Sequence, residues 1–310
     1  MYGGHGADRS VLLIVDNGAH WPDAADAIAL AGMRIADHVE WDAAAGHISR
    51  DAAHDVTMLE AQGVAAELLV SALAQIDRAA RLAGSQVIVA LGADQVDIVA
   101  AHLLGDHVQL LCEPGLTDRI AALTLAAASS GGSRLHDSSK DDEASRLRRL
   151  NEEVARIAET LARLTRRQAE TAPPERSAGL IGERQEAFAR SDGIEPIDPH
   201  RIRQAIRARR LRDQFFERGM FEDPAWDMLL DLFAADLEGT QVSVSSLCIA
   251  AAVAPTTALR WIAKMTDGGL FERRPDPFDR RRAYMALSPR AREGMRNYVV
   301  AAMRAGLDIA

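Results

Sequence analysis

Short apolar runs alternate with alanine-rich helical patterns over residues 1–128. Runs typical of buried strands are Val11–Val15, Val56–Leu59, Gln86–Leu91 and Val108–Cys112, with a weaker one at Arg34–Val39. Helical patterns lie between them at residues 22–31, 63–82, 94–104 and 116–128. Continuous apolar strands separated by helices are typical of a parallel sheet covered on both faces. Residues 1–128 are therefore predicted to form a doubly wound α/β domain of about five strands.

The hydrophobic period changes after residue 128. Residues 129–139 are rich in serine and glycine and predict a linker. Over residues 140–170, apolar side chains recur at alternating spacings of three and four, a seam too narrow to pack well on a globular core. The seam predicts a two-stranded parallel coiled-coil helix, and a single amphipathic helix packing on its own chain is the alternative. The predicted dimerisation residues are Leu147, Leu150, Val154, Ile157, Leu161 and Leu164.

Residues 171–198 predict a second linker, and mainly helical patterns fill residues 199–310. These patterns lie at 199–218, 224–237, 244–252, 255–267 and 289–306, with a short extended pair around 270–287. Ser245 or Ser246 is predicted to cap the helix at 244–252, and a three-residue turn leads to the next helix. On that next helix Ala258, Ile262 and Met265 share one face, which predicts that they pack inward.

The net charge of −9 conceals a strong division along the chain. Residues 1–138 carry a net −11, residues 139–198 a net −2, and residues 199–310 a net +4. The negative total therefore does not argue against nucleic-acid binding by the C-terminal region. Six arginines between Arg201 and Arg212 are either a basic stripe facing DNA or an ordinary solvated helix face, and Trp226 and Trp261 are predicted to lie in the core.

Several classes of function receive no support from the sequence. Cys112 and Cys248 have no CxxC neighbour, which favours buried thiols in a reducing compartment. No uncharged run reaches membrane-spanning length, so we expect a cytoplasmic protein without a membrane partner. The nine histidines show no HxxxH or HExxH spacing, and there is no GxSxG motif. We therefore expect no enzyme, no cofactor and no dedicated metal site.

An arginine-rich hairpin completes the C-terminal pattern. Gly268-Gly269 is predicted to end the helix at 255–267, and FERRPDPFDRRR then leads into the alternating run Ala283–Leu287. Such a proline-bounded tip suits a minor groove or a phosphate backbone. The segment TTALRWIAKMTDGGLFERRPDPFDRRRAYMALSPRARE resembles the winged helix-turn-helix of the MarR family of bacterial transcription regulators, over about residues 200–305. Ala291 stands where that family usually has glycine.

This resemblance implies a homodimer that binds double-stranded DNA at a pseudo-palindromic operator. It makes Asp279 and Arg281 the acidic–basic pair of the wing, and the face of the helix at 255–267 the recognition surface. The predicted DNA-binding residues are Ser245, Ser246, Thr256, Thr257, Arg260, Lys264, Arg273, Arg274, Arg280, Arg281 and Arg282.

Acidic residues end three of the predicted N-terminal strands, in a layout that resembles a response-regulator receiver domain. Asp16 and Asn17 match the family's acidic pair, Glu60 the phospho-accepting aspartate, and Glu113 the lysine before Pro114. Because Glu113 stands in place of the lysine cation that would neutralise a phosphoryl group, phosphorylation is implausible. The domain is therefore predicted to be a phosphorylation-independent pseudo-receiver that dimerises or docks a regulatory protein. Three carboxylates that bind a divalent cation, as in a metal or ligand sensor or an enzyme, are one alternative. A protein-interaction scaffold with a non-DNA-binding winged helix is the other.

Overall fold

The computed structural model describes residues 9–16, 18, 20–48, 54–132, 197–217 and 219–309. Its N-terminal part contains a five-stranded sheet in the order β2-β1-β3-β4-β5, and every neighbouring pair is parallel. This is the flavodoxin-like order of doubly wound folds. The strands are β1 (Ser10–Ile14), β2 (Arg34–Val39), β3 (Val56–Glu60), β4 (Gln86–Leu91) and β5 (Val108–Cys112). The predicted parallel α/β sheet is confirmed.

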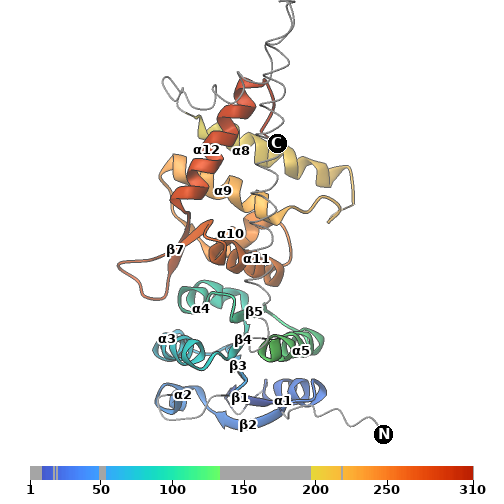
Figure 1. Cartoon of the computed structure of the whole chain (residues 1–310), viewed down its shortest axis with the longest axis vertical. Coiled ribbons are helices and arrows are strands. Elements are labelled where there is room, and N and C mark those ends of the chain that lie inside the picture. The colour runs from blue at the N-terminus through green and yellow to red at the C-terminus, as the bar shows by residue number, and fades with distance from the viewer. Residues whose placement is uncertain are drawn as a thin grey trace, which may run out of the picture. The chain divides into compact units, whose positions relative to one another are not determined.

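Helices cover both faces of this sheet, as Figure 1 shows. They are α1 (Trp21–Leu30), α2 (Trp41–Ile48), α3 (Ala66–Ala83), α4 (Val96–His102), which follows the 3-10 turn η1 (Ala93–Gln95), and α5 (Leu116–Gly132). One buried cluster joins α1 and α5 to side chains such as Leu13 and Met58. A second cluster joins α2, α3 and α4 to side chains such as Ile14 and Val89. The alternation of faces along each strand therefore supplies two cores.

Helices dominate the C-terminal part, together with a small antiparallel sheet in the order β6-β8-β7. The helices are α8 (Pro199–Leu211), α9 (Pro224–Glu238), α10 (Val244–Ala251), α11 (Pro255–Asp267) and α12 (Pro289–Arg304), with the 3-10 turn η2 (Arg212–Gln214). The strands are β6 (Val242–Ser243), β7 (Phe271–Pro275) and β8 (Ala283–Leu287). Proline in the first turn of α8, α9, α11 and α12 favours helix initiation there.

Two local predictions are wrong. The helix expected at 199–218 ends at Leu211 and is followed by η2. The cap of α10 is Ser243, whose Oγ accepts a hydrogen bond from the Ser246 amide at 3.1 Å. The helix therefore begins one residue after Ser243, and neither Ser245 nor Ser246 caps it.

The α/β part and the C-terminal part share a core within the described residues. Residues up to 130 and from 196 onward belong to one compact unit, and the cluster that covers α3 and α4 continues into α9, α10 and α11. The predicted coiled coil and its six apolar residues lie outside the described residues, as do Asn17 and most of both predicted linkers. Among the described residues, no single helix has the length and apolarity to cross a membrane, although the bent α10–α11 pair meets both criteria when counted together.

Candidate nucleic-acid interface

The α10–α11 pair has the geometry of a helix-turn-helix. Its two helices meet at 109° across the short segment after Ala251, within the range of about 90–120° usual for this motif. Ala252 makes the bend with a left-handed φ of +51°. Ala258, Ile262 and Met265 are buried, which confirms the predicted inward face of α11.

The rest of α11 presents polar side chains. Arg260 and Lys264 are exposed, and Thr256 and Thr257 are half-buried. The Lys264 ammonium lies 4.6 Å from the centroid of the Trp261 ring, and this cation–π contact holds the side chain over the helix surface. Trp261 is itself half-buried against the core, as is Trp226, so the predicted core position of these two indoles holds only in part.

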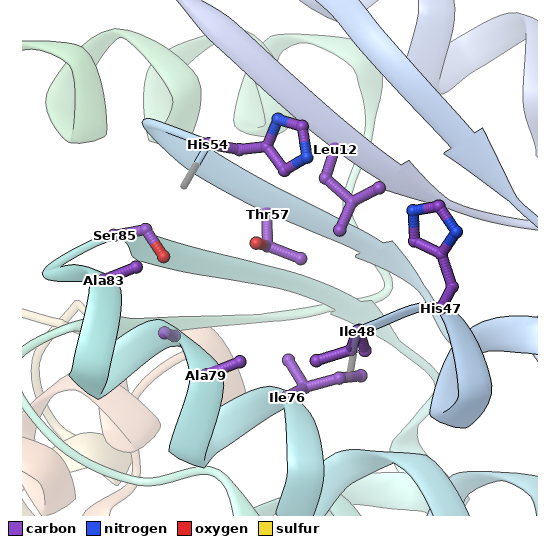
Figure 2. A pocket seen from close by; sticks show the side chains of 10 residues that line it. Leu12, His47, Ile48, His54, Thr57, Ile76, Ala79, Ala83 and Ser85 are labelled. Carbon is purple, nitrogen blue, oxygen red and sulfur yellow. The ribbon is translucent and has the colours of Figure 1, made fainter. Parts of the chain in front are cut away.

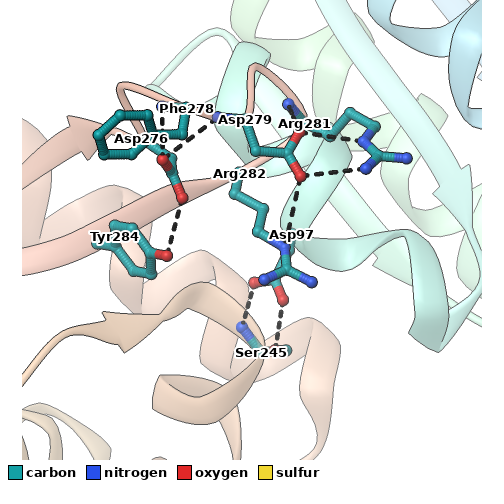
Figure 3. Close-up of polar contacts among 8 residues, drawn as sticks. All are labelled: Asp97, Ser245, Asp276, Phe278, Asp279, Arg281, Arg282 and Tyr284. Atoms are coloured by element: carbon teal, nitrogen blue, oxygen red, sulfur yellow. Dashed lines mark hydrogen bonds and ion pairs between the residues drawn. The ribbon is translucent and has the colours of Figure 1, made fainter.

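The hairpin that follows α11 has an ordered, arginine-rich tip, shown in Figure 3. The Asp276 carboxylate accepts hydrogen bonds from the Phe278 amide at 2.8 Å and from the Tyr284 hydroxyl at 2.9 Å. These bonds hold the pKa of Asp276 below its usual value. Between the two strands the tip leaves Phe278 98% exposed. The turn is therefore held by its own side chains rather than by packing.

Asp279 forms the expected pair with Arg281. Its carboxylate accepts hydrogen bonds from the Arg281 guanidinium at 3.0 and 3.2 Å and from the Arg281 amide at 2.9 Å. These bonds lower the pKa of Asp279, so it stays ionised. Arg280, Arg281 and Arg282 are all exposed at the tip. The hairpin therefore presents three cations to its surroundings, with one carboxylate fixing the direction of the middle one.

Three of the predicted DNA-binding residues instead contact the α/β part. Ser245 donates hydrogen bonds to the Asp97 carboxylate from its amide at 2.8 Å and from its hydroxyl at 2.7 Å (Figure 3). The Cys112 amide donates to the Thr256 hydroxyl at 3.0 Å.

Arg273 makes the third of these contacts. Its guanidinium donates to the Ala100 carbonyl at 3.0 Å, and burial lowers its pKa. Two further predicted residues bond locally: Arg274 pairs with Glu272 at 3.3 Å, and the Ser246 amide bonds to the cap Ser243.

The predicted carboxylate pocket is not assembled as expected. Glu60 is buried and accepts two hydrogen bonds from the buried Arg119 guanidinium, at 2.7 Å from Nε and 2.8 Å from Nη2. Arg119 also donates to the Pro114 carbonyl, and its hydrogen bonds to the Glu60 carboxylate raise the pKa of Arg119. Arg119 therefore supplies the cation that the sequence lacks at position 113, from the first turn of α5.

The other two predicted carboxylates have separate environments. Asp16 accepts a hydrogen bond from the Trp41 amide at 3.0 Å, at the start of α2. Glu113 is exposed and adopts a left-handed φ of +49°. Within the described residues, no three His, Cys, Asp or Glu side chains are arranged to hold a metal ion. The cation-binding alternative for Asp16, Glu60 and Glu113 therefore lacks geometric support.

Four of the six arginines from Arg201 to Arg212 have internal partners. Arg212 bonds to the Arg209 carbonyl and lies over the Phe221 ring, and the other three form ion pairs. Arg203 pairs with Glu238 and Asp231 of α9, while Arg209 and Arg210 pair with the buried Asp227. These pairs indicate that the arginines mainly hold α8 against α9 and do not form a basic stripe facing DNA. The sequence offered no signal for Asp227, which lies among apolar residues of α9 as an ordinary polar position.

A small cavity in the α/β part is lined in part by histidine and hydroxyl side chains, as Figure 2 shows. It has a volume of about 70 Å³ and lies between the sheet and α3, with His47 and His54 at one side and the hydroxyls of Thr57 and Ser85 at the other. This volume suits a few water molecules rather than an organic cofactor.

The chain has little detectable similarity to characterised proteins. No family model matches it, and no curated protein matches it. Among solved structures, S. aureus MepR bound to ethidium bromide is 15% identical over 34% of this chain and 72% of that chain, with a TM-score of 0.25. A likeness of this size assigns neither fold nor function.

Proposed function

We propose that this protein is a transcription regulator that binds double-stranded DNA through a MarR-like winged helix-turn-helix and acts by binding rather than by catalysis. The observation that carries the proposal is the combination of the 109° helix pair with the arginine-rich hairpin directly after it. In this assignment α11 enters the major groove, where Arg260 and Lys264 reach base edges or phosphates. The hairpin tip with Arg280, Arg281 and Arg282 lies on the adjacent backbone or minor groove.

A homodimer is part of this proposal. The regular apolar spacing of residues 147–164 supports association of two chains, and two chains would place their recognition helices on half-sites about one helical turn apart. The operator is then a pseudo-palindrome.

The α/β part serves in this proposal as a regulatory module that works without phosphoryl transfer. The support is the Glu60–Arg119 pair, because a carboxylate already bound to a buried guanidinium at the position of a phospho-acceptor leaves no nucleophile there.

A protein-interaction scaffold is the second candidate, and one observation favours it. Thr256 and Arg273 already bond to main-chain groups of the α/β part, so the face assigned to DNA is able to bind protein.

Selection of bound sequences from a random double-stranded library, using the full chain, tests the proposal. In the selected site, Arg260→Ala is expected to weaken binding by about tenfold or more, because a side chain that reaches a base contributes about 1–3 kcal/mol. Arg281→Ala is expected to lower the slope of log affinity against log salt by about one, because one phosphate contact is lost. Arg78→Ala, an exposed arginine of α3, is the charge-matched control. Binding that is unchanged by both substitutions would refute the assignment.

A further inference from the structure

Part of the proposed DNA-reading surface is covered by the α/β part of the same chain. Helix α11 lies along β5, the outermost strand of the parallel sheet, while α10 lies against α4 (Figure 1). The contacts that join the two parts involve Ser245, Thr256 and Arg273, three residues that the sequence assigns to DNA. The same groups cannot bond to the α/β part and to DNA at once.

Asp97 occupies the position of an anion at the start of α10. Its two carboxylate oxygens separately accept hydrogen bonds from the amide and the hydroxyl of Ser245, in the first turn of α10. The amide end of a helix favours negative charge, and a DNA phosphate takes the same pair of donors. Asp97 therefore satisfies these donors in the way a backbone phosphate would.

Thr256 closes the open edge of the sheet. Strand β5 pairs on one side only, with β4, so alternate amides on its other side have no strand partner. The Cys112 amide is one of these, and the Thr256 hydroxyl accepts its hydrogen bond. Thr256 belongs to the first turn of α11, the part of a recognition helix that reaches deepest into the major groove.

The two cations of α11 are exposed to solvent at the rim of a cleft. Arg260 and Lys264 line a cleft of about 550 Å³ between α11 and the β5–α5 segment. A cleft of this volume has room for a small molecule but not for a DNA duplex, whose major groove alone is about 12 Å wide.

From these contacts we propose that the free chain is autoinhibited, with Asp97, β5 and α4 holding the helix-turn-helix closed, and that DNA binding requires α10 and α11 to leave this surface. The inference rests on the proposed DNA-binding function. The net −11 of residues 1–138 against the net +4 of residues 199–310 favours the closed arrangement, and DNA competes for it as a stronger polyanion.

Asp97→Asn in the full chain tests the closed state without altering any residue assigned to DNA. Loss of a charged acceptor of two hydrogen bonds is expected to shift the equilibrium toward the open form and to raise affinity for the selected DNA by about tenfold. Asp94→Asn removes the same charge from an exposed neighbour in η1 and is the matched control, expected to change affinity less than about twofold.

Thiol alkylation supplies a second measurement that needs no DNA. Cys112 of β5 and Cys248 of α10 lie at the closed surface, and burial raises the pKa of Cys248 to about 12. The Asp97 charge itself helps to raise the pKa of Cys248, so the Cys112 thiol, on which Asp97 has no such effect, is the reporter. Because the thiolate is the reactive form, Cys112 is expected to react slowly with iodoacetamide in the wild type and about tenfold faster in Asp97→Asn.

The outcomes separate the inference from the function on which it rests. Faster alkylation of Cys112 and tighter DNA binding in Asp97→Asn, with the DNA affinity of Asp94→Asn unchanged, support autoinhibition. If the wild type binds a selected site and Asp97→Asn changes neither measurement, the autoinhibition fails and DNA binding stands. If no variant binds DNA, including one whose thiols react faster, the proposed function and this inference fail together.

Discussion

Replacing Arg119 by methionine removes the cation that is paired with the buried Glu60 carboxylate. The side chains of Arg119 and Glu60 are 2% and 0% exposed, and they are joined by two hydrogen bonds of 2.7 and 2.8 Å. Methionine keeps the unbranched apolar stem of the side chain, without the guanidinium, and leaves Glu60 buried without its cation. Breaking a buried pair in this way costs about 3–5 kcal/mol.

The double variant Glu60→Leu/Arg119→Met is the matched control. Removing both charges leaves no buried ion, so its stability is expected to lie within about 1–2 kcal/mol of the wild type. The difference between the single and the double variant isolates the cost of the unpaired carboxylate from the cost of altered packing.

Urea unfolding of the full chain measures these free energies. Trp41 is a local reporter, since its indole Nε1 donates a hydrogen bond of 2.8 Å to the main-chain carbonyl of Glu60. With a urea slope of about 2 kcal/mol/M, the midpoint of Arg119→Met is expected to fall by roughly 2 M. A loss below about 1 kcal/mol, the value of an exposed ion pair, would refute the reasoning. So would stabilisation of the wild type by Mg²⁺, because Glu60 would then prefer a metal to Arg119.

Two smaller predictions concern the half-buried Asp77 and the cap of α10. Burial raises the pKa of Asp77, but hydrogen bonds from His107 and Arg81 lower it by more than burial raises it. The net shift is downward from 3.8. A carboxyl group whose pKa is lowered in the folded state stabilises the protein at pH values above its unfolded pKa. The stability advantage of the wild type over Asp77→Asn in thermal unfolding should therefore shrink as the pH falls below 3.8. A difference that does not depend on pH would contradict this. Ser243→Ala should cost about 1 kcal/mol in urea unfolding and Ser246→Ala only a few tenths, because Ser243 caps α10. The reverse order would contradict that cap assignment.

Local pattern was sufficient to predict most of the described elements. Strands β4 and β5 and helix α11 have the predicted bounds, because each is a continuous apolar run or an amphipathic repeat between clear breakers. Helix α2 was missed because Trp41–Ile48 is only eight residues long and contains Gly46. The Asp16 carboxylate at its start was the available signal, and it was interpreted instead as part of the acidic pair of a receiver-like pocket.

Partners of buried charges could not be predicted in the same way. Glu60 and Arg119 are 59 positions apart, and Asp97 and Ser245 are 148 positions apart. Periodicity describes which face a side chain is on but not which distant group meets it there. The carboxylates at the ends of β1, β3 and β5 were correctly placed in sequence, but the chemistry of Glu60 depends on Arg119, whose own position looks like an ordinary helix surface.

The capping of the β5 edge by Thr256 has a consequence for solubility. An outer strand with bare amides is a template on which any extended chain can add, and such edges begin aggregation unless something blocks them. Here the blocking group belongs to the helix that is assigned to DNA. If α11 leaves this surface as proposed, each release uncovers the Cys112 amide and the edge of β5. In the proposed closed state, the hydroxyl that holds α11 back from DNA also satisfies one amide of this edge.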